Sequence, residues 1–376
     1  MAQILTLALA TVSLALPANP IAPAADQHSA RFSIEILALG TAAQAYPGAA
    51  CINDRGDVAG FLRYDRPTRY RGVVWRDGQP MELPGLGGLD TFALGLNARG
   101  DVVGVAEPGD TDPTGAAVTQ AVRWTDGTVV QLGSLGGRSS FAIGVDNTGV
   151  VVGSAQTGEV DSGTGLPITH ACSWDKQGRI NDLGTLGGTN AFAIASTPNG
   201  VVLGAGEIRR IDPSTGVPVV RSFRILNGLM SDLGDLGGNG CRASAMNYHG
   251  VIVGSADTTE VSSSGTPLQH AFLWRDGLMV DLGTLGGAES FATGINSRGQ
   301  IVGASNVPRT PSGVLAHGCL WDQGRTLDLN DLVPEDNPWE IVEADCISER
   351  GEILAVGRRG FLDYILLLLR PTASER

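Results

Sequence analysis

The sequence predicts an all-β protein, a seven-bladed β-propeller built from four-stranded repeats, on the strength of three observations. A double glycine recurs at a nearly constant interval, each interval contains four runs of strand length, and the chain ends one strand short of a complete seventh unit. The composition agrees, because 53 glycines with only 5% aromatic and 17% charged residues are typical of many short strands joined by glycine turns.

The repeat is about 50 residues long. The double glycines begin at Gly87, Gly136, Gly187, Gly237 and Gly286, so the steps are 49, 51, 50 and 49 residues. A second marker, a glycine three residues after a usual Asn or Asp, occurs seven times, at Gly56, Gly100, Gly149, Gly200, Gly250, Gly299 and Gly351. Four-stranded units of this length, repeated four to eight times, are typical of β-propellers.

Each repeat contains four strand-length runs, as in "SFATGIN", "QIVGAS", "HAFLW" and "LMVDLG". The Asn-x-x-Gly and Asp-Gly pairs between them favour tight hairpins. The third run ends in an aromatic residue or its substitute: Trp75, Trp124, Trp174, Ile225, Trp274, Trp321 and, as the nearest candidate in the seventh unit, Tyr364. Because Trp274 recurs with the period while its surroundings change, we expect it to pack between blades.

The two chain ends are predicted to share one blade. The seventh unit ends after its third strand, at residues 361–369, and the segment "FSIEILALGTAAQAY" from Phe32 aligns with "GLMVDLGTLGGAESF" from Gly277. We therefore expect the N-terminal strand to complete the last blade, which closes the ring and leaves no exposed sheet edge. Residues 32–370 would then form a single domain.

The first 25 residues are predicted to be a signal peptide. Residues 4–16, "ILTLALATVSLAL", form an apolar run of signal-peptide length, and Ala22-Pro23-Ala24 offers a small-residue cleavage pattern, although no Lys or Arg precedes the run. The protein is accordingly expected to be secreted, periplasmic or displayed at the cell surface. No integral membrane segment is expected in the mature chain, because the later apolar run at residues 361–369 has only strand length.

Charge and cysteine usage exclude several classes of function. The net charge is −13 and Lys176 is the only lysine, so the sequence has no basic stripe for nucleic acid. Five cysteines lie far apart without a Cys-x-x-Cys pair, which argues against a zinc site and favours buried thiols. Cys51 and Cys346 occupy the same place in the first and last repeats, but a bridge would require equivalent sites on neighbouring units to lie unusually close.

The phrases "DLGTLGG", from Asp281, and "HAFLW", from His270, resemble the HAF-repeat family of probable extracellular repeat proteins. The resemblance covers nearly the whole chain after the leader. The tripeptide itself varies, because "QAV", "HAC", "RSF" and "HGC" begin at Gln120, His170, Arg221 and His317. The resemblance implies an exported repeat protein of unsettled function, and it brings no catalytic residues to this sequence.

No catalytic, cofactor-binding or metal-binding residue is predicted. His170, His270 and His317 recur at one position of three repeats, but they belong to different blades, so we expect a structural role such as hydrogen bonding across blades. Asp182, Asp232 and Asp281 recur before "LG", and capping of the adjacent turn is the expected role.

Function is expected on the long loops between the second and third strands, which differ from repeat to repeat while the strands do not. Their acidic residues are predicted to form a ligand-binding rim: Asp110, Asp112, Glu159, Asp161, Asp212, Asp257 and Glu260. The sequence thus predicts a non-catalytic binding or structural module for a protein or carbohydrate. The alternative is a carbohydrate-active enzyme, a hydrolase or lyase with its site on the loop face or in the central channel. A convergent carboxylate pair at the channel mouth would favour the enzyme, and a channel lined by Ala, Gly, Ser and Thr would favour the scaffold.

Overall fold

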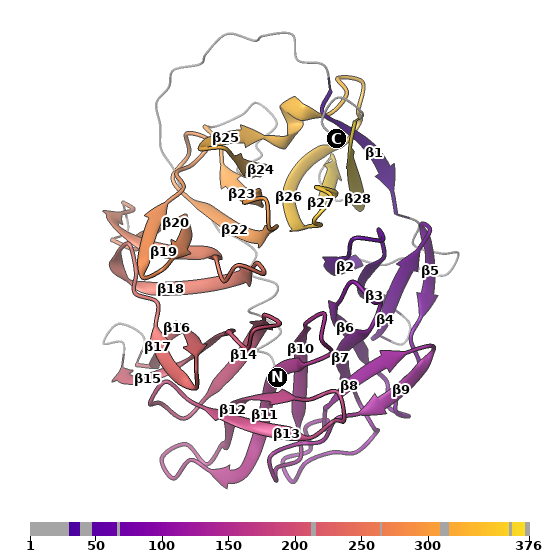
Figure 1. Ribbon diagram of the computed structural model, residues 1–376, viewed down its shortest axis with the longest axis vertical. Coiled ribbons are helices and arrows are strands. Elements are labelled where there is room, and N and C mark those ends of the chain that lie inside the picture. Colours follow the sequence, from indigo (N-terminus) through magenta and orange to yellow (C-terminus); the bar gives the residue numbers. More distant parts are fainter. Residues whose placement is uncertain are drawn as a thin grey trace.

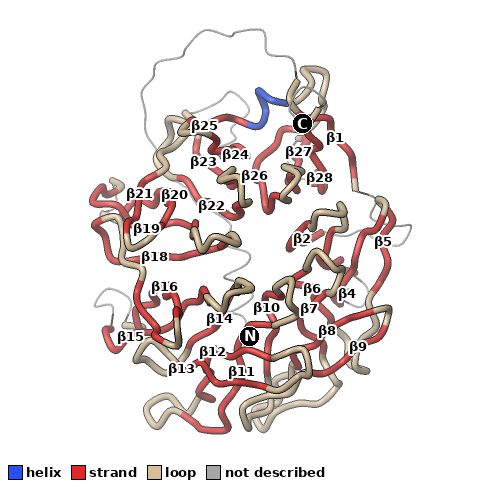
Figure 2. Tube along the Cα trace, viewed as in Figure 1, coloured by secondary structure: helices blue, strands red, loops and turns tan. Residues whose placement is uncertain are grey.

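The computed structural model describes residues 30–37, 47–65, 68–211, 216–263, 265–308, 316–360 and 363–372. These residues form seven antiparallel sheets of four strands each, arranged in a ring around a central axis (Figure 1). The described chain is strand and loop apart from one 3-10 helix, η1 (Leu329–Leu332), between the sixth and seventh sheets (Figure 2). The predicted seven-bladed β-propeller is confirmed.

In the first six blades the strands follow one another from the innermost to the outermost. Blade 1 contains β2 (Pro47–Ile52), β3 (Val58–Asp65), β4 (Thr68–Arg76) and β5 (Gln79–Glu82). Blade 2 contains β6 (Thr91–Leu96), β7 (Val102–Ala106), β8 (Gln120–Thr125) and β9 (Thr128–Gln131). Blade 3 contains β10 (Ser140–Val145), β11 (Val151–Val160), β12 (Pro167–Trp174) and β13 (Ile180–Gly184).

The next three blades repeat this order. Blade 4 contains β14 (Ala191–Ser196), β15 (Val202–Ile211), β16 (Pro218–Leu226) and β17 (Leu229–Asp232). Blade 5 contains β18 (Gly237–Met246), β19 (Ile252–Val261), β20 (Pro267–Arg275) and β21 (Leu278–Asp281). Blade 6 contains β22 (Ser290–Ile295), β23 (Ile301–Asn306), β24 (Ala316–Asp322) and β25 (Arg325–Asp328).

Blade 7 is shared by the two ends of the chain, as predicted. It contains β26 (Glu340–Ile347), β27 (Ile353–Arg359), β28 (Asp363–Pro371) and, on the outside, β1 (Phe32–Ile36), which lies beside β28 in Figure 1. The pairing of β1 with β28 is antiparallel and runs from Phe32 opposite Pro371 to Ile36 opposite Leu367. The N-terminal strand therefore covers the edge that β28 would otherwise expose.

The predicted tight turns adopt the conformations that their glycines allow. All seven marker glycines have positive φ, from 76° at Gly250 to 92° at Gly149. At Asp77-Gly78 both residues have positive φ, 50° and 72°, which is the type I′ hairpin geometry. A side chain at Gly100 would also collide with the guanidinium of Arg55 from the preceding blade.

The recurring tryptophans lie in the hydrophobic layers between blades. Trp274 is only 4% exposed and packs in one cluster with Leu203 of blade 4 and with Cys241 and Phe272 of its own blade. The guanidinium of Arg224 lies 4.7 Å from the centre of the Trp274 ring. The prediction that Trp274 packs between blades is confirmed, and Ile225 is buried at the equivalent place in blade 4.

The choice of Tyr364 as the seventh aromatic marker is wrong. Ile353 of β27 pairs with Leu369, just as Ile252 pairs with Trp274 in blade 5, so Leu369 occupies the marker position and is fully buried. Tyr364 is 40% exposed near the start of β28. The marker was misplaced because the leucine run 366–369 offers no aromatic residue at which to set the register.

The five cysteines are free thiols. Cys172, Cys241 and Cys319 are buried, whereas Cys51 and Cys346, on the innermost strands of blades 1 and 7, are half-buried. Burial raises the pKa of Cys346 to about 11, so this thiol is poorly reactive. Within the described residues there is no helix of sufficient length and apolarity to cross a membrane.

Candidate functional site

The propeller has two faces, which we name after their connections. On the turn face lie the Asn-x-x-Gly turns between first and second strands, together with the short turns between third and fourth strands. On the loop face lie the connections between second and third strands and those that lead to the next blade. The two faces differ in how their polar groups are used.

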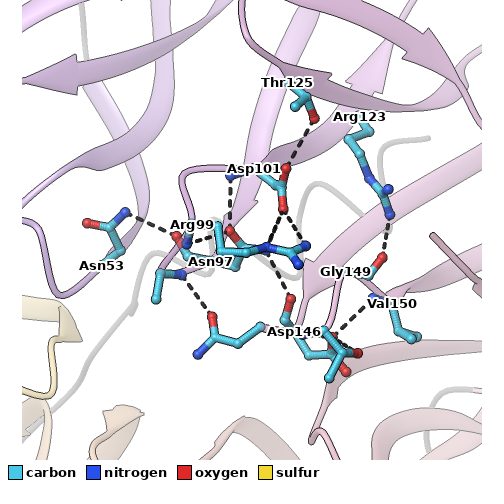
Figure 3. Close-up of polar contacts among 12 residues, drawn as sticks. Asn53, Asn97, Arg99, Asp101, Arg123, Thr125, Asp146, Gly149 and Val150 are labelled. Carbon is cyan, nitrogen blue, oxygen red and sulfur yellow. Dashed lines mark hydrogen bonds and ion pairs between the residues drawn. The ribbon is translucent and has the colours of Figure 1, made fainter.

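On the turn face, hydrogen bonds join the turns of successive blades. Within its own turn, the Oδ1 atom of Asn97 accepts hydrogen bonds from the N–H groups of Arg99 and Asp101, and its Nδ2 donates to the carbonyl oxygen of Asp146 in blade 3 at 3.0 Å (Figure 3). Equivalent bonds run from Asn53 to Asn97, from Asn247 to Asn296 and from Asn296 to Ser348. Blades 3, 4 and 7 have Asp146, Thr197 and Ser348 at this position, which lack a carboxamide and cannot make the bond.

On the loop face, three of the predicted rim carboxylates already accept hydrogen bonds within the protein, two from their own loops and one, Asp257, from the neighbouring strands β18 and β20. Asp112 accepts hydrogen bonds from the N–H groups of Thr114 and Ala116, and Asp161 accepts them from Gly163 and Thr164. The hydroxyl of Thr114 lowers the pKa of Asp112, and that of Thr164 does the same for Asp161. The carboxylate of Asp257 accepts from the N–H of Gly240 and from the side chain of Gln269, at 2.7 and 2.9 Å.

The remaining rim residues divide into two groups. Asp110, Glu159 and Glu260 are exposed, and their carboxylates make no hydrogen bond or ion pair with the described part of the chain. Asp212 lies outside the described residues. The structure therefore keeps three of the seven predicted rim residues available to a ligand, and they belong to blades 2, 3 and 5.

The loop face also exposes large aliphatic side chains, a feature that the sequence analysis missed. In blades 3, 4 and 5 the second and third strands continue beyond the sheet as two-stranded arms, which end at the pairs Val160–Pro167, Ile211–Pro218 and Val261–Pro267. Near the arm tips the exposed fractions are 59% for Val160, 64% for Leu166, 53% for Ile211 and 60% for Val261. The equivalence of Val160, Ile211 and Val261 appears only once the strand pairing is known.

The recurring histidines pair with the recurring aspartates. His170, His270 and His317 approach Asp182, Asp281 and Asp328 at 2.9, 2.7 and 2.5 Å, each from the third to the fourth strand of one blade. In blade 4, Arg221 replaces the histidine and binds Asp232 at 3.1 Å. The histidines do make hydrogen bonds, as expected, but those of His170 and His270 lie within a blade and not across blades. The capping role is also confirmed, because Asp182, Asp232 and Asp281 accept hydrogen bonds from the N–H groups of Gly184, Gly234 and Gly283.

His317 differs from the other two because it also faces blade 7. Its Nε2 lies 3.4 Å from the carboxylate of Glu340, which in turn pairs with Arg358 at 3.0 Å. Burial alone would lower the pKa of His317, but the carboxylates of Asp328 and Glu340 outweigh that effect and raise it. This is a polar network across the seam between blades 6 and 7.

A second candidate site surrounds the central axis. Burial alternates along the innermost strands: in β14, Ala191 and Ala193 are buried and pack with Val152 of blade 3, whereas Phe192 and Ile194 keep part of their surface accessible. The accessible set therefore borders the central channel that propellers form. We call this set, over blades 2 to 7, the inner ring: Leu94, Phe141, Ile143, Phe192, Ile194, Arg242, Ser244, Phe291, Thr293, Glu343 and Asp345. Phe92, at the equivalent position of blade 2, is buried and packs against Phe61 and Tyr70 of blade 1.

The two halves of the inner ring differ in chemistry. Blades 2 to 4 contribute two phenylalanines and three aliphatic residues, whereas blades 5 to 7 contribute Arg242, Ser244, Thr293 and the carboxylates of Glu343 and Asp345 beside one phenylalanine. A β-bulge in each innermost strand lies at the second ring position, as between Ala344 and Cys346 at Asp345. Bulges turn a side chain out of the ladder and are frequent next to functional sites.

Glu343 and Asp345 are the most unusual groups of the ring. The Glu343 side chain is exposed and that of Asp345 is half-buried, yet burial raises the pKa of both carboxyl groups, and Glu343 raises that of Asp345 further. Neither carboxylate has a hydrogen-bond or ion-pair partner in the described part of the chain. The ring thus contains two carboxylates on one strand, as an enzyme site would. It is not lined by Ala, Gly, Ser and Thr alone, as expected for a scaffold.

On the turn face, one side chain joins two blades that are not neighbours. The hydroxyl of Tyr248, in the turn after β18, lies 2.6 Å from Nδ2 of Asn147 in blade 3, so the contact spans blade 4. Burial raises the pKa of Tyr248, and the carboxylates of Asp54 and Glu349, from the turns of blades 1 and 7, contribute. The turns of blades 3 and 5 therefore meet at Tyr248.

Comparison with known proteins supports the fold. No family model and no curated protein matches the sequence. The β-propeller domain of the Trilobed protease from Pyrococcus furiosus matches with a TM-score of 0.53 at 8% identity, covering 86% of this chain and 93% of that chain. The acylaminoacyl peptidase of Pyrococcus horikoshii matches with a TM-score of 0.54 at 11% identity, covering 87% of this chain and 52% of that chain. This chain thus spans about half of that peptidase. At such identities the likeness establishes the propeller fold alone.

No metal centre is formed by the described residues, since they contain no group of three or more His, Cys, Asp or Glu side chains that could hold an ion. Glu343 and Asp345 were not predicted from the sequence, although a signal existed: the seventh repeat reads "VEADCI" where the sixth reads "SFATGI". Acidic residues at positions that are aromatic or aliphatic in blades 2 to 4 mark the departure.

Proposed function

We propose that the protein is an exported repeat protein, in line with its resemblance to the HAF-repeat family, and that it acts as a non-catalytic binding module. Its ligand, a protein or a carbohydrate, binds on the loop face. The observation that supports this proposal is the row of arm tips, where Val160, Ile211 and Val261 are each more than half exposed. Aliphatic side chains that recur on one face without being buried are typical of an interaction surface.

The free carboxylates complement these apolar tips. Glu159 immediately precedes Val160, and Glu260 immediately precedes Val261, so an acidic and an aliphatic side chain adjoin on two of the arms. An apolar centre with a charged rim is the usual anatomy of a protein interface. Asp112 and Asp161 contribute to the same surface indirectly, because they hold their loops in shape, and Asp257 does so by linking β18 with β20.

The test is a ligand screen on the purified mature chain, using soluble glycans and peptides, followed by titration of the best ligand against two sets of variants. Val160→Ser, Ile211→Ser and Val261→Ser together should weaken binding at least about tenfold. The matched control is Leu229→Ser with Leu278→Ser, which removes equally exposed leucines from the outer strands β17 and β21. Equal affinity in the two sets of variants would contradict binding by the arms.

A carbohydrate-active enzyme remains the second candidate, and the pair Glu343 and Asp345 is the observation that favours it. Glycoside hydrolysis uses two carboxyl groups about 5 to 10 Å apart, one with a raised pKa. The purified chain would then release reducing sugar from an oligosaccharide in the same screen, and Glu343→Gln would abolish that release. Turnover that survives Glu343→Gln would exclude this pair as its source.

A further inference from the structure

We infer that a cavity on the turn face, between blades 5 and 6, binds a small hydroxylated carboxylate, the class of molecule that includes the sugar acids. The cavity has a volume of about 340 Å³, which is within the range of small-molecule pockets. It is lined by the turns that follow β18 and β22 and by the hairpin between β20 and β21. It shares no residue with the loop-face surface proposed above and is a second, separate site.

Blade 2 shows what the equivalent place holds elsewhere in the ring. There the carboxylate of Asp101 accepts hydrogen bonds from Nδ2 of Asn97 and from the guanidinium of Arg99, both at 2.8 Å (Figure 3). The hydroxyl of Thr125 donates to the same carboxylate at 3.2 Å. In blade 1, Asp57 occupies this place and accepts from the same kinds of donor. In these two blades the protein itself supplies the anion.

Blade 5 keeps donors at this place but has lost the carboxylate. The pairing of its strands puts Val251 where blade 2 has Asp101. The same pairing puts Arg275 where blade 2 has Thr125. The guanidinium of Arg275 makes no hydrogen bond or ion pair with the described part of the chain. A cationic donor therefore replaces a hydroxyl at the point where the acceptor is missing.

Asn247, which lines the cavity, gives independent evidence for a missing acceptor. Its side-chain amide has two N–H groups and the residue is only 5% exposed. One N–H donates to the carbonyl oxygen of Asn296 at 3.1 Å, and the other has no acceptor among the described residues. In Asn97 both are used, one by Asp101 and one by Asp146. A buried donor without an acceptor is unfavourable, so an acceptor that enters the cavity is favoured.

The space for a ligand exists because a histidine replaces an arginine. In blade 2 the guanidinium of Arg99 extends over the next blade, so that a methyl group placed on Gly149 would lie 2.6 Å from its Nη2 atom. In blade 5 the equivalent residue is His249, whose side chain is shorter. No described atom lies within 4 Å of a methyl group placed on Gly299, the equivalent glycine of blade 6. The seam between blades 5 and 6 is therefore open where the seam between blades 2 and 3 is filled.

The charge of the ligand follows from the two arginines that line the cavity. The planar fork of a guanidinium such as that of Arg275 matches a carboxylate, which it binds with two parallel hydrogen bonds. Arg298 adds positive charge, although its guanidinium extends over Gly351 of blade 7. Asp276, the one carboxylate among the lining residues, makes no ion pair with either arginine in the described part of the chain. The cavity is thus a positive site on a chain with a net charge of −13.

The remaining lining residues favour a hydroxylated body on the ligand. The exposed side chains of His249 and Asp276 can exchange hydrogen bonds with hydroxyl groups. The described residues that line the cavity include no Phe, Tyr or Trp, so an aromatic or apolar body gains little there.

The experiment compares two probes of nearly equal size, D-glucuronate and its neutral amide, titrated into the full mature chain near neutral pH by calorimetry and ligand-observed NMR. Glucuronate should bind at least about tenfold more tightly than the amide, because only glucuronate offers a charged acceptor. Arg275→Gln should reduce the affinity for glucuronate at least about tenfold and leave that for the amide unchanged. Val251→Asp restores the carboxylate that blades 1 and 2 have at this place, so it should also weaken glucuronate binding at least about tenfold.

The matched control is Arg76→Gln. Arg76 follows Trp75 in blade 1 just as Arg275 follows Trp274 in blade 5, but Asp57 already supplies the anion there. This variant should bind glucuronate as the native chain does. Equal loss in Arg76→Gln and Arg275→Gln would overturn the site, because the general field of the turn face would then explain binding.

Three further outcomes would overturn the inference: no binding of glucuronate, equal binding of glucuronate and its amide, or tighter binding of inorganic phosphate than of glucuronate. Melting curves verify folding, and if Val251→Asp does not fold, Arg275→Gln alone decides. The arm-tip variants should not affect this titration, so the two proposals fail separately.

Discussion

The turn face and the loop face are built from the same seven repeats but are stabilised differently. On the turn face, Asn97 bonds both its own turn and the carbonyl of the next blade. On the loop face, Asp161 bonds only the loop that contains it. A residue whose partner lies in the next repeat is constrained by that repeat, whereas a residue with local partners is not. The constant turns and the divergent loops of this chain follow from that difference.

Blade 4 supports this explanation. The two seams that flank it lack the amide-to-carbonyl bond, because Asp146 and Thr197 stand where blades 1, 2, 5 and 6 have Asn. Blade 4 also has Ile225 in place of tryptophan and Arg221 in place of histidine. Ser348 replaces Asn in the same way in blade 7, where Leu369 also replaces the tryptophan. Where the turn-face bonds are absent, other repeat positions have also changed. The predictions below test which interactions hold the blades together, in order of expected effect.

The largest effect should come from removing β1. A chain that begins at Thr41 lacks the strand that pairs with β28 and loses the buried Phe32, so blade 7 is left with an open edge. We expect it to lose cooperative thermal unfolding, as measured by calorimetry, while a chain that begins at Asp26 retains it. Identical melting temperatures for the two chains would contradict closure by the N-terminal strand.

The next largest effect should come from the hydrophobic layer between blades 4 and 5. Trp274→Ala removes a buried ring between blades 4 and 5 and should lower the free energy of unfolding by about 3 to 5 kcal/mol. Leu278→Ala, at a leucine that is 66% exposed, is the control and should change it by less than about 0.5 kcal/mol. A loss below about 1 kcal/mol for Trp274→Ala would be inconsistent with burial.

A smaller effect distinguishes the two faces directly. Asn97→Ala removes hydrogen bonds at a site that is 3% exposed and should lower the free energy of unfolding by about 2 to 3 kcal/mol. Asp161→Ala removes a similar set from an exposed loop, so it should leave chemical denaturation nearly unchanged and only speed amide exchange at Gly163. Comparable losses of stability in both variants would show that the two faces do not differ as described.

The smallest effect should depend on pH and involve the seam between blades 6 and 7. The raised pKa of His317 means that its protonated form is stabilised by Asp328 and Glu340. Its contribution is fully present below the ordinary histidine pKa of 6.5 and is lost as the pH rises through the higher pKa of the folded state. Denaturation of the native chain and of His317→Gln should therefore differ more at about pH 5.5 than at about pH 8.5. Glu340→Gln should reduce this pH dependence, and a difference that grows with pH would contradict the assignment.

Much of the fold was predictable because it depends on interactions between residues close in sequence. The marker glycines require positive φ, the aspartates before "LG" cap the turn two residues later, and alternating apolar residues form strands of about six residues. These properties repeat with the period, so seven weak local signals reinforce one another. Even the contribution of Phe32 to blade 7 was predictable from the sequence. The seventh repeat lacks a fourth strand at the C-terminal end, and the segment from Phe32 at the N-terminal end has the pattern of a fourth strand.

The candidate sites depend on distances that the sequence does not contain. The rim residues are equivalent in the sequence, since all are Asp or Glu. In the structure the carboxylates of Asp112 and Asp161 accept hydrogen bonds from their own loops, whereas that of Glu159 does not. Leu369, and not Tyr364, fills the seventh marker position because strand register is set by pairing with β27.

By itself, then, the sequence determined the number of blades, the strands of each blade and the turns between them, because a period and local turn chemistry are sufficient for these. Only the tertiary structure decided which side chains meet: the arm tips of blades 3 to 5, Tyr248 with Asn147, and the inner ring with Glu343 and Asp345. The physical reason is that closure of a ring brings together residues separated by about 50 residues or a multiple of 50, and their side chains interact through space without any trace in local sequence.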